Sequence, residues 1–128
     1  MESGKSLNEY VYPFTCDTYL FVGKRVAAVY FGKERVAVKN WRGVFKLLLQ
    51  TCNKENHDNL MYLRNKAAGK VRLFLSDKPD TMVKPFKIDD ELFADSGQYG
   101  TATLLHILRE RILKPASFDY TNIRIAIQ

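Results

Sequence analysis

The chain has 128 residues, of which 46% are hydrophobic and 27% charged, and it carries a formal net charge of +6 at pH 7. This length and composition predict a single globular domain with one core and exclude a wholly disordered chain. The first residues lack the apolar segment of a secretory signal, and no run of about 18 apolar residues is present, so we expect a cytoplasmic protein without a membrane span. Cys16 and Cys52 are too few for a disulfide framework, and we expect both thiols to be free.

The basic residues are unevenly distributed along the chain. Residues 24–72 contain twelve Lys or Arg and three acidic residues, whereas the rest of the chain contains eight Lys or Arg and eleven acidic residues. A surface of one sign attracts polyanions and speeds their encounter with the protein, but it implies no reaction. The charge pattern therefore indicates a class of partner, and no sequence motif indicates a catalytic chemistry.

The N-terminal part of the chain predicts a flexible start followed by strands. We expect residues 1–9 to be a flexible segment and residues 10–128 to form one domain. Residues 10–22 are aromatic and β-branched but are interrupted by Pro13, which is typical of an edge strand.

A β-hairpin is predicted over residues 25–31 and 35–39, with its turn at Gly32. Alternation puts one row of apolar side chains on one face of this hairpin: Val26, Ala28, Tyr30, Val36 and Val38. Arg25, Arg35 and Lys39 have the opposite parity, so we expect these three residues on the other face.

The residues after the hairpin predict two helices. Asn40 offers a side-chain acceptor for the free N–H groups of a helix start. An apolar stripe follows at helical spacing: Trp41, Val44, Phe45, Leu48 and Leu49. We expect residues 53–58 to break this helix and residues 60–67 to form a shorter one, closed by Gly69.

The second half of the chain predicts further strands and one helix. They are a strand at 71–76, a loop at 77–90 with a short extended piece at 86–88, a strand at 91–94, a helix from Thr101 to Pro115 and a strand at 118–127. In the last strand, Ile123, Ile125 and Ile127 share one face. Runs of strands and helices without strict alternation predict an α+β fold, with a mixed, largely antiparallel sheet of about five or six strands and about three helices packed on one face.

Two groups of residues are candidates for catalysis. Cys52 and His57 are close in the sequence, but Cys52 continues the apolar helix stripe, so we interpret it as a core residue and not as an activated nucleophile. Acidic residues concentrate between positions 77 and 95, where a nuclease could hold a divalent metal, with the candidates Asp77, Asp80, Asp89 and Asp90. No acidic residue is followed two positions later by Lys, a familiar restriction-nuclease spacing, and loop charges usually serve solubility. We expect no catalytic residue, metal or cofactor, and a metal-dependent nuclease is our third hypothesis.

The leading hypothesis is a non-enzymatic accessory domain that binds the phosphates of DNA or RNA. Its predicted phosphate contacts are Arg25, Arg35, Lys39, Arg42, Arg64, Lys66, Lys70 and Arg72. If these side chains share a face, binding is salt-sensitive and largely independent of sequence. The alternative explanation of the same charges is an ordinary solvated sheet face whose edge lysines prevent aggregation.

One pattern in the chain resembles a known kind of domain. The hairpin leads through Val36, Val38, Asn40 and Trp41 into Val44 and Phe45, and a later strand, turn and helix follow Phe93, Ala94, Asp95 and Ser96. Over roughly residues 25–127 this order of elements resembles a small, uncharacterised bacterial domain that occurs alone or appended to restriction-system and mobile-element proteins. The resemblance implies a prokaryotic accessory domain near DNA transactions and supplies no catalytic residue.

The second hypothesis is a protein-interaction module or homodimer. Backbone pairing at a free sheet edge needs little side-chain chemistry, and the candidate edges are residues 10–22 and 118–127.

Overall fold

The computed structural model describes residues 9–66, 75–97 and 99–128. Its strands are β1 (Tyr10–Pro13), β2 (Val26–Phe31), β3 (Glu34–Ala37), β4 (Leu75–Ser76), β5 (Pro85–Asp89), β6 (Leu92–Asp95) and β7 (Ile123–Ile127). Its α-helices are α1 (Trp41–Lys66) and α2 (Thr101–His106), and α2 continues into a π-helical segment, η3 (Ile107–Leu113). Two short 3₁₀ turns are η1 (Thr18–Phe21) and η2 (Pro79–Thr81). The predicted α+β class is confirmed.

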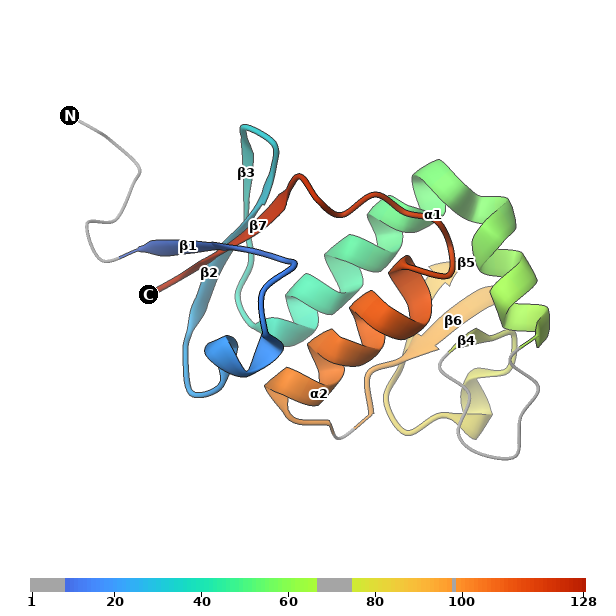
Figure 1. The fold of residues 1–128 in the computed structure, drawn as a ribbon. Coiled ribbons are helices and arrows are strands. Elements are labelled where there is room, and N and C mark those ends of the chain that lie inside the picture. Colours follow the sequence, from blue (N-terminus) through green and yellow to red (C-terminus); the bar gives the residue numbers. More distant parts are fainter. Residues whose placement is uncertain (1–8, 67–74, 98) are drawn as a thin grey trace.

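The described strands form two antiparallel sheets, so the prediction of one sheet is wrong. The first sheet has the order β1-β7-β2-β3 and the second has the order β4-β6-β5. In Figure 1 the helices occupy the middle of the view, with the four-stranded sheet to the left and the three-stranded sheet to the right. The second sheet was missed because β5 lies inside residues 77–90, which read as a loop with two prolines and only a short extended piece at 86–88.

The β2–β3 hairpin is confirmed, but its faces are not as predicted. Val26 pairs with Ile127 and Ala28 with Ala126, so β2 holds one extra residue, Ala27, opposite β7. Such a bulge reverses the alternation of side chains along the strand. Val26 therefore packs in the main core, whereas Ala28 and Ala126 form a small cluster on the opposite face of the sheet.

Helix α1 begins and breaks where the sequence predicts. The Gly43 N–H donates to Asn40 Oδ1 at 2.8 Å, which caps the first turn. The predicted apolar stripe is fully buried except for Trp41, which is half-buried. Asn56 has the non-helical angles φ −131° and ψ 44°, within the predicted break. Its Nδ2 donates to Ala116 O at 2.9 Å and to Ser117 O at 3.0 Å. One helix with a kink thus replaces the two predicted helices, because these bonds fix the break against the end of η3.

The remaining segments confirm one predicted edge and correct the other. Within residues 10–22, the strand ends at Pro13, and Asp17 then caps η1 by accepting the Tyr19 N–H at 3.0 Å. β1 is an edge strand, as predicted. Residues 118–127 do not offer a free edge, because β7 lies between β1 and β2.

One hydrophobic core joins the described parts of both sheets to the helices. It includes Phe45 of α1, Leu92 of β6, Leu105 of α2 and Ile125 of β7, all of them fully buried. Burial of apolar side chains in this core is the main favourable contribution to folding. In the described ranges, no helix combines the length and the apolar character needed to cross a membrane.

Candidate nucleic-acid interface

Helices α1 and α2 start at the same end of the molecule. Near the start of α1, Arg42 donates from Nε to Ser96 Oγ at 3.1 Å and from Nη2 to Gly97 O at 3.4 Å, just before α2 begins. Near the far part of α1, Asn56 contacts Ala116, just after η3 ends. The two helices therefore run parallel, as Figure 1 also shows.

Basic side chains gather at this common end. Lys24 lies beside the first turn of α1, because its carbonyl accepts the Trp41 Nε1–H at 3.0 Å. Among the described residues, the group consists of Lys24, Arg25, Lys39, Arg42, Lys46 and Lys84, all exposed and named here the basic end. The first turns of α1 and α2 contain no acidic residue.

The buried carboxylate of Asp95 holds part of the basic end in place. Asp95 is 1% exposed, and its Oδ1 accepts the N–H groups of Lys84 at 3.0 Å and Gly97 at 2.7 Å. Its Oδ2 accepts the Val83 N–H at 3.2 Å. Backbone dipoles that point at a carboxylate compensate its burial. Asp95 thereby fixes the backbone of Lys84 next to the segment that leads into α2.

A groove separates the first two turns of α1 from the start of β5. It has a volume of about 420 Å³ and is lined by Asn40, Arg42, Gly43, Lys46, Lys84, Pro85, Phe86 and Ser96. Phe86 packs edge-on against Phe45 of α1, with ring centroids 5.7 Å apart. The groove therefore combines three basic side chains with an apolar side formed by β5, and we call it the α1–β5 groove.

The predicted phosphate contacts do not all come together. Arg25, Lys39 and Arg42 belong to the basic end. Arg35 forms an ion pair with Glu9, whose side chain is 2% exposed. Arg64 lies beyond the kink of α1, where its Nη1 donates to Glu91 O at 2.8 Å. Lys70 and Arg72 lie outside the described residues, as does the side chain of Lys66.

Three members of the basic end are not among the predicted contacts. Lys46 follows Arg42 by four residues on the same helix, so helical spacing alone could have identified it. Lys24 precedes Arg25. Lys84 carries no sequence signal, because it belongs to a stretch dominated by acidic residues and is positioned through Asp95.

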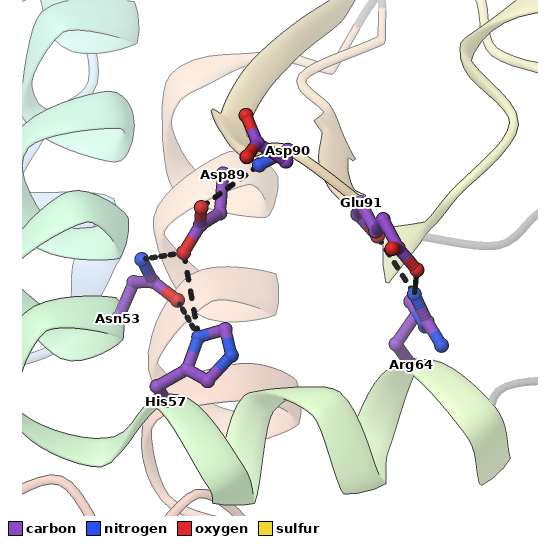
Figure 2. Close-up of polar contacts among 6 residues, drawn as sticks. All are labelled: Asn53, His57, Arg64, Asp89, Asp90 and Glu91. Carbon is purple, nitrogen blue, oxygen red and sulfur yellow. Dashed lines mark hydrogen bonds and ion pairs between the residues drawn. The ribbon is translucent and has the colours of Figure 1, made fainter.

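A second polar cluster lies at the middle of α1, against the turn between β5 and β6 (Figure 2). His57 Nδ1 is 2.7 Å from Asn53 Oδ1 and 3.5 Å from Asp89 Oδ2. Asn53 Nδ2 donates to the same Asp89 oxygen at 3.1 Å, and the Asp90 N–H donates to Asp89 Oδ1 at 2.8 Å. The hydrogen bond from Asn53, helped by the Asp90 N–H and the nearby His57, lowers the pKa of the Asp89 carboxyl. Asp89 is therefore a charged residue that joins two elements.

These polar residues do not assemble a recognisable catalytic site. Cys52 is fully buried, as predicted, and burial raises the pKa of its thiol to about 12, so it is no thiolate nucleophile at neutral pH. Over residues 9–66, 75–97 and 99–128, no three His, Cys, Asp or Glu side chains are grouped so that they could hold a metal ion. Of the four nuclease candidates, Asp77, Asp80 and Asp90 are exposed, and Asp89 is half-buried and bonded to Asn53.

Comparisons with protein-family models, curated proteins and solved structures found no match to this chain. The resemblance to a bacterial accessory domain and the cytoplasmic location therefore stay predictions, and the function has to be argued from the molecule itself.

Proposed function

We propose that the protein is a non-enzymatic nucleic-acid-binding domain that holds phosphates at its basic end. The observation that carries this proposal is the gathering of Lys24, Arg25, Lys39, Arg42, Lys46 and Lys84 around the start of α1. These cations come from three separate parts of the chain, residues 24–25, 39–46 and 84.

The electrostatics of the basic end favour an anionic ligand. The oxygens of Asp95, which bind the Lys84 backbone, accept three backbone N–H groups. The side chains of Lys46 and Lys84 form no ion pair with any residue that the structure describes. Like charges held within a Debye length of about 8 Å repel one another, and a polyanion relieves this repulsion.

The proposal predicts a strong dependence on salt. If all members of the basic end contact phosphates, the slope of log K against log salt is about −4 to −5. Affinity then falls about a thousandfold between about 50 mM and about 200 mM salt. Fluorescence anisotropy with a labelled oligonucleotide, as a single strand and as a duplex, measures this slope.

A pair of matched variants tests the location of the site. Lys46→Gln with Lys84→Gln removes two charges from the basic end, and we expect the salt slope to shrink by about 2 units. Lys33→Gln with Lys54→Gln removes the same charge from the β2–β3 turn and from α1 beyond the groove, and we expect little change. Equal effects of the two double variants, or binding that ignores salt, would refute phosphate binding at the basic end.

A protein partner or homodimer is the second candidate, and a group of exposed apolar residues favours it. Tyr10 is 63% exposed, Tyr19 74%, Leu20 48% and Val22 51%, and all belong to β1 or to the segment that follows it. Backbone pairing at the free edge of β1 is limited. The Phe14 N–H donates to Ile123 O of β7, so the backbone groups that point away from β7 are those of Val11 and Pro13. Pro13 has no N–H to donate. Light scattering over a range of concentrations distinguishes a homodimer from a monomer.

A further inference from the structure

The composition of the α1–β5 groove suggests which form of nucleic acid it receives. The start of α1 offers the charges of Arg42 and Lys46, and the β5 segment offers the charge of Lys84 beside the apolar surfaces of Pro85 and Phe86. A nucleotide has the same division between a charged phosphate and a flat, largely apolar base. We infer that the protein binds single-stranded nucleic acid, with one unstacked nucleotide in this groove, its phosphate at the basic side chains and its base against Pro85 and Phe86. This inference rests on the proposed function.

A duplex fits the groove less well than a single strand. In a duplex the bases are stacked inside and the phosphates form the convex outer surface, so no base can enter a concave site unless it is flipped out. A single strand presents unstacked bases, and proteins bind it by combining a basic groove with surfaces on which bases pack. The groove volume of about 420 Å³ lies in the range of pockets that hold a small organic ligand.

The walls of the groove are fixed before any ligand arrives. Arg42 is held by Ser96 and Gly97, and the backbone of Lys84 is held by Asp95. Phe86 is fixed by its edge-on contact with Phe45. A site that is already ordered loses little conformational entropy on binding, which favours affinity.

Gly43 lines the groove at its α1 side. A Cβ atom built at this position would lie 3.4 Å from Asn40 Oδ1 and 3.6 Å from Val38 Cβ, which is ordinary contact, so neither backbone angle nor crowding requires glycine here. Glycine inside a helix is unfavourable compared with other residues. We expect a longer side chain at this lining position to narrow the groove without changing its charge.

The test compares strands with equal phosphates and different bases. Anisotropy titrations with the full chain use 12-nucleotide oligothymidylate, an abasic strand of the same length and a 12-base-pair duplex, at about 50 mM salt. We expect oligothymidylate to bind at least about fivefold more tightly than the abasic strand, because packing of one base contributes that much or more. Oligouridylate is measured in parallel, and a base-dependent difference with either sugar supports the inference.

Gly43→Gln is the variant that addresses the groove alone. We expect it to weaken oligothymidylate binding at least about fivefold while changing abasic binding by less than about twofold. Gly43→Ala, which adds one carbon, should have a smaller effect in the same direction, and thermal unfolding checks that both variants are folded. Should Gly43→Gln not fold, the Gly43→Ala variant and the abasic comparison still decide the question.

Different binding results would refute the single-strand inference and the proposed function. Equal affinity for oligothymidylate and the abasic strand, or tighter binding of the duplex, overturns the single-strand inference while leaving phosphate binding intact. If no strand binds at low salt, or if the Lys46→Gln and Lys84→Gln double variant binds like the wild type, the proposed function fails and the inference fails with it.

Discussion

The two ends of helix α1 use charge in different ways. Beyond the kink and near it, several charged side chains have partners: Arg64 bonds to Glu91, Asn53 donates to Asp89, and Lys87 Nζ lies 3.4 Å from Asp90 Oδ1. At the start of the helix, the side chains of Lys46 and Lys84 form no ion pair within the described part of the chain. Paired charges join elements of the fold, whereas gathered charges of one sign are available to a ligand. Paired charges thus hold this molecule together, and the basic end is where we propose that a partner binds.

Replacing Asp95 should have the largest effect, because the basic end is assembled on this carboxylate. Asp95→Ala leaves three backbone N–H groups without their acceptor in a buried position, and we expect the free energy of unfolding to fall by about 3 kcal/mol. Urea denaturation measures this loss. Asp95→Asn keeps one carbonyl acceptor and should lose less. If Asp95→Ala is as stable as the wild type, Asp95 does not support the basic end.

Replacing Asn56 tests the opposite end of the comparison. Asn56→Ala removes two hydrogen bonds that hold the kink of α1 against Ala116 and Ser117, and we expect a loss of about 1 to 2 kcal/mol in the free energy of unfolding. Nucleic-acid affinity should not change, because Asn56 lies far along α1 from the groove. The control is Lys54→Ala, an exposed residue of the same helix. A large loss of binding in Asn56→Ala would contradict the division of the helix into two ends.

Local sequence patterns predicted the elements better than their arrangement. The β2–β3 hairpin, the Asn40 cap and the break near Asn56 follow from short-range spacing, and the structure confirms all three. The bulge at Ala27 could not be predicted, because alanine is compatible with a regular strand and the extra residue is defined by its partner, β7. The central position of β7 likewise depends on contacts between distant parts of the chain.

The residues of the basic end show the same limit of prediction from local sequence patterns. Arg25, Lys39 and Arg42 were identified from the charge count, which assumes that residues near in sequence stay together. Arg64 does not join them, because α1 carries it away from the start of the helix and Glu91 binds it there. Lys84 joins them from a distant segment, because the buried Asp95 accepts its N–H. Charge composition therefore predicted that basic residues could gather, whereas contacts between distant parts of the chain determine which residues lie at the basic end.

Replacing Ser117, whose carbonyl accepts a hydrogen bond from Asn56, should have a smaller effect on stability. Its φ of 59° is in the left-handed region, which is unfavourable for residues with a Cβ atom. We expect Ser117→Gly to raise the free energy of unfolding by about 0.5 kcal/mol, since relief of this strain exceeds the added flexibility of the unfolded chain. Ser117→Val should lower it instead. Thermal unfolding of both variants measures the difference, and equal stabilities would mean that the backbone here is not strained.

The smallest effect is expected from Asp89, which is partly exposed. Hydrogen bonds from Asn53 and the Asp90 N–H, together with the nearby His57, lower the pKa of Asp89 in the folded protein. A carboxyl group whose folded pKa is lowered stabilises the fold above its unfolded pKa of about 3.9, and this contribution is lost as the pH falls through the folded value. Asp89→Asn lacks this contribution, so its stability should decline less steeply than that of the wild type between about pH 5 and about pH 3. Glu110 and Asp119 also have lowered pKa values and remain in the variant, so the acid sensitivity should shrink without disappearing. Thermal unfolding across this pH range measures both curves, and parallel curves would show that the Asn53–Asp89 bond does not contribute to holding the β5–β6 turn against α1.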